Sequence, residues 1–257
     1  RFAELRAAWL LPVAAETYDG YLNDINGGHV TREVVFEALD AAGTGPIELG
    51  SVGGGTGMNC YGFKGGNGSA SRLVEFAGQM YTVGVFLQCN FGSRHELRIA
   101  GVPLGAVFAQ DDPLGEWSPG ADGAGSVIGV VITDAPLLPQ QCTAMARRVP
   151  LGLARTGTTG SHYSGDLFLA LSTANPGAFA TGFAPEEERS GEISSIRFLP
   201  WGRIDVLYAA VVAAAEEAVV DALVANDEMI GRDGHRTPAL PRERLAEVLR
   251  GDSASDH

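Results

Sequence analysis

The chain has 257 residues, enough to bury one large core or two small ones, and a formal net charge of −13. This acidity, with an isoelectric point near 4.7, disfavours nucleic acids and anionic membrane surfaces as partners. No uncharged apolar run of about 18 residues occurs, so the sequence predicts no membrane-spanning helix.

Helical and strand patterns alternate along the chain. Residues 2–11 have helical spacing but begin without a Met, a signal peptide or a capping residue, which we interpret as an N-terminal truncation. Thr31 is expected to cap a second helix that extends to Asp40 and ends at the glycines of residues 43–45. We predict strands at 71–76, 80–90, 96–99, 127–133 and 167–173, and helices at 139–153, 204–225 and 241–249.

The order of these elements favours one fold class. Strands come in adjacent sets with helices grouped after them, which predicts an α+β layered sandwich. No internal repeat is apparent, so a solenoid or another repeat architecture is not expected.

Cysteine usage gives a weak indication of the compartment. Cys60, Cys89 and Cys142 are widely spaced and form no CxxC pair, so we expect reduced, structural thiols. Reduced thiols favour the cytoplasm over the periplasm, and no other feature of the sequence locates the protein.

Ser126 stands at a junction between a loop and a buried strand. The loop at 111–125 is rich in Asp, Gly and Pro, whereas 127–132 is mostly β-branched. A glycine at 125 lets the peptide bond become strained and lets the serine hydroxyl approach its carbonyl. Attack on that carbonyl would free an α-amino group, whose reference pKa of about 7.7–8.0 suits a base for the same hydroxyl. Taken alone, however, the junction fits an ordinary loop-to-strand boundary better than a self-cleaving nucleophile.

Other chemistries find little support. The glycine tract at 43–68 contains Lys64 without a following Ser or Thr and holds no GxGxxG, so close backbone packing is favoured over phosphate binding. No GxSxG elbow occurs, and His162 is too near Ser164 and Asp166 in sequence to form a triad readily. No metal-binding motif is present, so no metal or other cofactor is expected. The remaining histidines considered are assigned to the surface or to supporting positions: His29, His95 and His235.

Six groups of residues along the chain match the signatures of one known family: 16–25, 53–58 with 63–72, 88–92, 125–126 with 133–137, 164–166 and 229–235. In these groups the chain resembles the self-processing aminopeptidases, which comprise the L-aminopeptidase/D-amidase/D-esterases and the β-peptidyl aminopeptidases. The groups follow the family's order across nearly the whole chain, so the resemblance is specific. It implies a four-layer αββα sandwich in which a buried strand presents the nucleophile, as in the related ornithine acetyltransferases.

The resemblance also implies how the chain is divided. Residues 1–257 would be a single catalytic domain without its N-terminal part, because members of the family carry a substantial segment before this point. Self-cleavage of the Gly125–Ser126 bond would leave 1–125 as the remainder of an α-chain and 126–257 as a β-chain.

Three site residues follow from matching positions. Ser126 would be the nucleophile for both self-cleavage and substrate hydrolysis. Asn90 falls on the family's oxyanion asparagine, and its side-chain N–H could stabilise the developing charge. Tyr18 matches the active-site tyrosine, whose phenol could donate to the oxyanion or orient the substrate. Composition alone would instead make Asn90 a turn residue and Tyr18 an ordinary half-buried tyrosine.

Two further residues complete the expected site. Ser164 and Asp166 lie two positions apart on an extended segment and so face the same side, where they could form a relay beside the new α-amino group. Some relatives carry Glu at the position of Asp166, so whether the shorter Asp side chain reaches far enough to form this relay is left open. Asp134 and Lys64 fit supporting roles.

The implied reaction is removal of an N-terminal residue from small peptides, amides or esters that have a free amine, through an acyl-enzyme on Ser126. The preference for α- or β-amino acids, and for L or D, is left open, because part of the amine pocket lies in the family's N-terminal segment. A homo-oligomer, a tetramer of processed protomers, is expected. The alternatives are an acyltransferase related to ornithine acetyltransferase, which would be expected to have a Thr nucleophile, and an inactive remnant or subunit.

Overall fold

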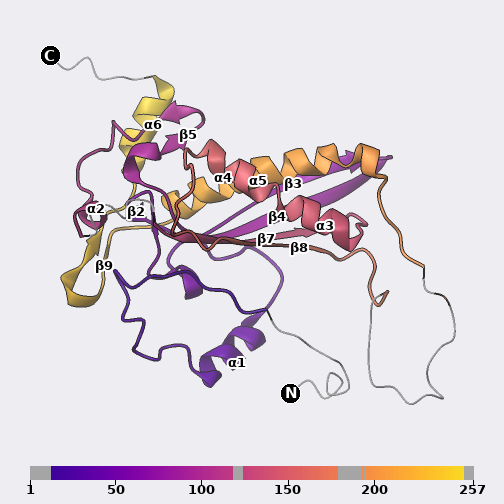
Figure 1. Ribbon diagram of the computed structural model, residues 1–257, viewed down its shortest axis with the longest axis horizontal. Helices are drawn as coiled ribbons and strands as arrows, with labels where there is room; N and C mark the ends of the chain where they lie inside the picture. Colours follow the sequence, from indigo (N-terminus) through magenta and orange to yellow (C-terminus); the bar gives the residue numbers. More distant parts are fainter. Residues whose placement is uncertain (1–12, 118–123, 179–192, 194, 252–257) are drawn as a thin grey trace.

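A long four-stranded sheet organises the computed structural model, which describes residues 13–117, 124–178, 193 and 195–251 (Figure 1). Its strands, in spatial order, are β3 (Gly66–Phe76), β4 (Gln79–Asn90), β7 (Ser126–Thr133) and β8 (Leu167–Ser172). β3, β4 and β7 are antiparallel, whereas β8 runs parallel to β7. Ala77 and Gly78 join β3 to β4 with positive φ angles of 52° and 76°, as a tight hairpin turn requires.

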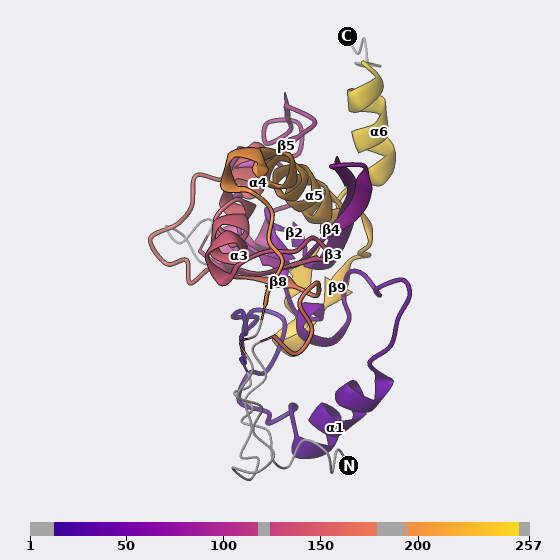
Figure 2. The same ribbon diagram turned by 90° about the vertical axis from the view of Figure 1, so that its right-hand side faces the viewer.

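One face of this sheet is covered by helices α3 (Pro139–Ala146), α4 (Val149–Arg155) and α5 (Asp205–Val224), which Figure 2 shows together on one side of the strands. α5 is apolar nearly all round, as expected for a helix packed between a sheet and a second helix. Gly68 permits this packing, since a Cβ there would lie 1.8 Å from the carbonyl oxygen of Ala218. The main core therefore lies between the sheet and α5.

The opposite face of the sheet is open in the described part of the chain. Side chains of β7 alternate between buried and more accessible positions, and Ser126 shares the accessible face with Ile132. On β8 the leucines at 167, 169 and 171 occupy alternate positions and so share one face, where they are between 42% and 55% exposed. The predicted nucleophile thus lies at one end of an apolar, uncovered sheet face.

Short helices, 3₁₀ turns and two-residue strands make up the other regular elements of the described residues. The other helices are α1 (Arg32–Ala41), α2 (Pro113–Trp117), α6 (Arg242–Arg250), and the 3₁₀ turns η2 (Gly53–Gly55), η3 (Arg94–Glu96), η5 (Trp201–Arg203) and η6 (Arg232–Gly234). Two-residue strands pair as hairpins: β1 (Asn59–Cys60) with β2 (Phe63–Lys64), β5 (Arg98–Ile99) with β6 (Val102–Pro103), and β9 (Met229–Ile230) with β10 (Arg236–Thr237). The β1–β2 hairpin lies against the end of β4 and so helps to fix Asn90.

Most predicted elements are confirmed to within a few residues, including α1 with its Thr31 cap, where the hydroxyl accepts from the Val34 N–H. Two predictions were wrong in detail. The helix expected at 139–153 is broken into α3 and α4, because Pro150 cannot donate to a continuous helix and instead occupies the first turn of α4. The strand expected at 96–99 begins as the η3 turn, which a Ser93–Glu96 capping box closes. The helix expected at 2–11 lies outside the described residues.

The α+β class is confirmed. Of a four-layer sandwich, the described residues provide one sheet and the helical layer on it. In the same residues no helix has the length and apolar character needed to cross a bilayer.

Candidate active site

Ser126 is the first residue of β7 and pairs across the sheet with Asn90, the last residue of β4. Its Oγ accepts a hydrogen bond from the backbone N–H of Gly165 at 2.9 Å. Residue 165 is a glycine, which leaves room for this contact, because a Cβ at that position would lie only 3.3 Å from the Ser126 oxygen. The hydroxyl is therefore held by a backbone donor that sequence reasoning did not identify.

Gly125 is required by a close backbone approach. A Cβ at this position would lie 2.0 Å from the carbonyl oxygen of Asn90, well inside van der Waals contact. The strand pairing of Asn90 with Ser126 thus excludes any side chain on the residue whose carbonyl the serine would attack.

Gly125→Ala is expected to slow self-cleavage at the 125–126 bond strongly, because the added methyl group must push β7 away from β4. Intact-mass analysis of freshly purified protein over time gives the rate. Gly129→Ala is a useful comparison, since its Cβ would meet only side chains, Phe168 and Leu87, which can shift. Equal processing of wild type and Gly125→Ala would contradict the close approach.

Ser164 and Asp166 are brought beside Ser126 by the parallel pairing of β7 with β8. The Ser164 hydroxyl donates to Asp166 Oδ1 at 2.6 Å, and the same oxygen accepts from the backbone N–H of Val127 at 2.9 Å. The carboxylate is therefore fixed one residue away from the nitrogen that cleavage would turn into an α-amino group. Asp166 reaches β7 despite being shorter than Glu.

Asn90 is 6% exposed, and hydrogen bonds hold both the oxygen and the nitrogen of its carboxamide. Its Oδ1 accepts from the backbone N–H of Asn59 at 3.0 Å, and its Nδ2 donates to the carbonyl of Tyr18 at 2.8 Å. A carboxamide nitrogen has two N–H groups, so one remains for a ligand. The Tyr18 ring itself is exposed and folds over Gly20, where a Cβ would lie 2.3 Å from the phenol oxygen. In this structure Tyr18 contacts Asn90 through its backbone.

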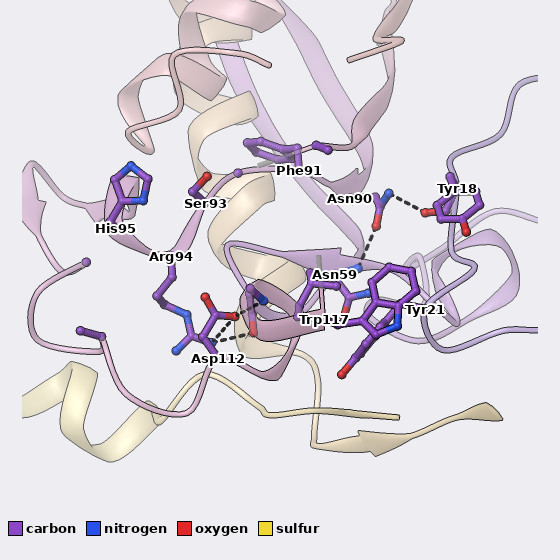
Figure 3. A pocket seen from close by; sticks show the side chains of 17 residues that line it. Tyr18, Tyr21, Asn59, Asn90, Phe91, Ser93, Arg94, His95, Asp112 and Trp117 are labelled. Carbon is purple, nitrogen blue, oxygen red and sulfur yellow. Dashed lines mark hydrogen bonds and ion pairs between the residues drawn. The ribbon is translucent and has the colours of Figure 1, made fainter. Parts of the chain in front are cut away.

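A cavity of about 330 Å³ opens beside Asn90 (Figure 3). Aromatic side chains that sequence reasoning missed form part of its lining: Tyr21 packs edge-on against Trp117, with ring centroids 5.2 Å apart. His235 stacks on the Tyr21 ring with centroids 4.7 Å apart and also packs edge-on against Trp117 at 5.9 Å. In the view of Figure 3, Asn90 lies toward one end of the lining and Arg94 toward the other.

Arg94 is buried beneath this cavity, where its N–H groups are used by the protein itself. They donate to the carbonyls of Tyr61, Gly62, Phe108, Gln110 and Asp111. The guanidinium also lies 3.4 Å from the centroid of the Phe63 ring. Arg94 therefore shapes the cavity and is not available to bind a substrate carboxylate.

A second cavity, of about 170 Å³, lies beside the Ser164–Asp166 pair. Its lining includes Gly125, Ser164, Asp166 and the residues 158–161. Phe91 lines both cavities. Ala124 lines the first cavity together with Asn90, and Gly125 lines the second together with Ser164 and Asp166, so the bond predicted to be cleaved lies close to both.

Lys64 is fully buried at the end of β2. Its ammonium donates to the carbonyls of Gly55, Met58 and Gly65 at 3.2, 3.0 and 2.8 Å. Burial lowers the pKa of Lys64 to about 7, while the nearby charge of Asp19 acts in the opposite direction. The glycine tract is therefore folded around an amine rather than a phosphate.

This lowered pKa predicts a pH dependence of stability. The unfolded chain keeps the proton up to the ordinary value of 10.5, so between about pH 7 and 10.5 it binds more protons than the folded state. The free energy of unfolding should therefore rise with pH across this window. Urea unfolding at several pH values would measure it, and Lys64→Met should lack this contribution. If the free energy of unfolding depended on pH equally in the wild type and Lys64→Met, the lowered pKa of Lys64 would be contradicted.

The other candidate residues contact neighbouring parts of the protein. Asp134 accepts from the backbone N–H of Thr82 at 2.7 Å, and the His162 ring packs against Tyr163 with centroids 5.2 Å apart. The three cysteines are free thiols, as predicted, and burial raises the pKa of Cys60. Within the described ranges, no cluster of three His, Cys, Asp or Glu side chains could hold a metal ion.

Comparison with known proteins identifies the family. The model of peptidase family S58 matches residues 3–237. This chain belongs to peptidase family S58. The resemblance inferred from the sequence is thereby confirmed.

Relatives in this family are described as aminopeptidases. The chain is 43% identical to a β-peptidyl aminopeptidase, BapA, of Sphingosinicella microcystinivorans over 257 residues, covering 95% of this chain and 62% of that protein. Among solved structures, a Burkholderia sp. β-aminopeptidase has a TM-score of 0.86 at 41% identity, covering 99% of this chain and 68% of that one.

A further solved relative extends the fold assignment. The L-aminopeptidase D-Ala-esterase/amidase of Ochrobactrum anthropi has a TM-score of 0.84 at 44% identity, over 95% of this chain and 64% of that one. It is described as a prototype for the serine aminopeptidases and as a variant of the Ntn-hydrolase fold. This S58 chain therefore has the layered fold expected from its sequence, and it spans about three fifths of the length of the curated relatives it matches.

Proposed function

We propose that this chain is part of a self-processing serine aminopeptidase that removes N-terminal residues from small peptides, amides or esters. The observation that carries the proposal is the environment of Ser126. Its hydroxyl accepts from the Gly165 N–H, it pairs with Asn90, and the next residue donates to Asp166. Membership of a peptidase family favours hydrolysis over acyl transfer.

In the proposed self-cleavage, Ser126 Oγ loses its proton and attacks the carbonyl carbon of Gly125. The C–N bond breaks, and the departing nitrogen takes up a proton to become the α-amino group of Ser126. Water then hydrolyses the resulting ester, which leaves a carboxylate on Gly125 and restores the hydroxyl. The chain would then consist of residues 1–125, the remainder of the α-chain, and 126–257, the β-chain.

In substrate hydrolysis the new α-amino group would accept the proton of Oγ as the serine attacks the substrate carbonyl. The free N–H of Asn90 would donate to the resulting oxyanion, and the proton would pass to the leaving amine. Water then releases the acyl group. Asp166, held by Ser164 and Val127, lies where it would stabilise the protonated amine. Tyr18 is assigned to orienting the substrate at the mouth of the cavity beside Asn90.

Hydrolysis of p-nitroanilides of L-alanine, D-alanine and β-homoalanine by the processed protein tests this function and defines the substrate class. Release of nitroaniline from at least one of them, blocked by a serine-reactive sulfonyl fluoride, is expected. A processed protein that is inert toward all three and unlabelled by the reagent would instead support the inactive remnant.

We also propose that the complete protein covers the open face of the sheet and assembles as a homo-oligomer, a tetramer of processed protomers. The exposed leucines of β8 support a covering layer, because an apolar face of this kind is rarely left in water. Sedimentation velocity of the processed protein reports the assembly, and a single monomeric species would contradict it.

A further inference from the structure

Lys64 is a buried cation that the proposed chemistry does not use. Its three hydrogen bonds end on three carbonyl oxygens, which together require three N–H donors. Only the ammonium form provides three, since a neutral amine has two N–H groups and a lone pair. The hydrogen-bond geometry therefore corresponds to the charged form, which with a pKa of about 7 is the major form below pH 7.

One of these carbonyls connects the charge to the oxyanion site. The carbonyl of Met58 and the N–H of Asn59 belong to the same peptide unit, and that N–H donates to Asn90 Oδ1 at 3.0 Å. Asn90 lines the cavity, and the nitrogen end of its carboxamide has a second N–H besides the one that donates to the Tyr18 carbonyl. A continuous series of hydrogen bonds thus runs from Lys64 Nζ through one peptide unit to the donor at the site.

Such a series strengthens its last member. A cation bonded to a carbonyl draws electron density toward that oxygen, which makes the N–H of the same peptide a better donor. The Asn90 carboxamide is polarised in turn, so its free N–H binds a negative oxygen more tightly than an isolated amide would. The effect is largest where the dielectric is low, and both Lys64 and Asn90 are buried.

We propose that Lys64 is a positioning residue of the oxyanion site, whose ammonium orients and polarises Asn90 through the Met58–Asn59 peptide. This rests on the proposed function, because it takes Asn90 as the oxyanion donor. The residue would contribute to the transition state without touching the substrate.

Stabilising the β1–β2 hairpin is a different role from polarising Asn90, and the two can be tested separately because other contacts also hold this hairpin. The Lys64 backbone N–H donates to the carbonyl of Pro238, and Thr237 Oγ1 donates to Asn59 Oδ1 at 2.6 Å. Asn226 Nδ2 donates to the carbonyl of Gly65 at 2.8 Å. These bonds survive the loss of the Lys64 ammonium.

The test compares Lys64→Met and Lys64→Gln with Thr237→Val. Lys64→Met removes charge and donors, Lys64→Gln keeps N–H donors without charge, and Thr237→Val removes a buried bond to Asn59 outside the series. Assayed below pH 7, where the ammonium is the major form of Lys64, both Lys64 variants should lose about tenfold in kcat, less than the 10²–10³ expected for losing the donor itself, with KM nearly unchanged. The Ki of 1-aminoethylboronic acid, whose tetrahedral adduct mimics the oxyanion, should rise by the same factor. Thr237→Val should lose thermal stability but keep kcat and Ki.

A second readout does not depend on activity. The amide proton of Asn59, followed by ¹H–¹⁵N NMR, should move upfield in both Lys64 variants as its hydrogen bond to Asn90 weakens. An unmoved Asn59 resonance, or equal losses of kcat in Thr237→Val and the Lys64 variants, would overturn the proposal. If the wild type shows no hydrolysis and is not labelled at serine, the proposed function fails, and the Asn59 shift still decides whether Lys64 polarises Asn90.

Discussion

Ser126→Ala is expected to leave the chain uncleaved between residues 125 and 126 and to abolish aminopeptidase activity. The loss in kcat should be on the order of 10⁶, the size found when a serine protease loses its nucleophile. Both proposed reactions use the same oxygen, Ser126 Oγ, which accepts a hydrogen bond from the Gly165 N–H at 2.9 Å. Intact-mass analysis measures the cleavage, and p-nitroanilide hydrolysis measures the activity.

Two comparisons make this result specific. Ser126→Thr keeps a hydroxyl and should still be processed, more slowly because the extra methyl group restricts the side chain. Ser172→Ala removes a serine at the far end of β8, where the hydroxyl donates to the Ala135 carbonyl, and should be processed normally. Cleavage at the same bond in Ser126→Ala would rule out the mechanism.

Asn90→Ala is expected to lower kcat by about 10²–10³, the usual consequence of removing one oxyanion donor. It also leaves the Asn59 N–H without its acceptor, which should reduce the free energy of unfolding by about 1–3 kcal/mol. Kinetics on the processed protein give kcat and KM, and urea unfolding gives the stability.

Asn90→Asp is the matched variant, because it retains an oxygen for the Asn59 N–H but has no N–H to donate. Its second carboxylate oxygen would face the Tyr18 carbonyl, which Asn90 Nδ2 contacts at 2.8 Å, so its stability should not recover to that of the wild type, while its kcat should fall at least as far as that of Asn90→Ala. If either variant changed KM alone, Asn90 would position the substrate and would not stabilise the transition state.

Periodicity located the principal elements of the fold because each of them buries a continuous apolar stripe. The strand expected at 80–90 and the helix expected at 204–225 correspond to β4 and α5, the two elements that meet in the core. The break between α3 and α4 was missed because apolar spacing continues through it, although Pro150 marked it. The two-residue strands around the site were also missed, since their pairing depends on partners distant in sequence.

The candidate site was found only in part for a similar reason. Ser126 was marked by the change from loop to strand, and Ser164 with Asp166 by their spacing of two residues on an extended segment. The donors that hold them are backbone N–H groups of Gly165 and Val127, which carry no signal in the sequence. The aromatic lining of the cavity was missed because its residues are far apart along the chain.

By itself, the sequence of this protein determined the α+β class, the principal strands and helices, the family, and which side chains could carry the chemistry. These follow from local periodicity and from residue types that occur in a fixed order. The tertiary structure decided what surrounds each of those side chains. It placed Asn90 opposite Ser126, Asp166 beside Val127, and the Lys64 ammonium one peptide unit from Asn90. Strand register and backbone hydrogen bonds set these contacts, and they arise only when segments distant in the chain pack together.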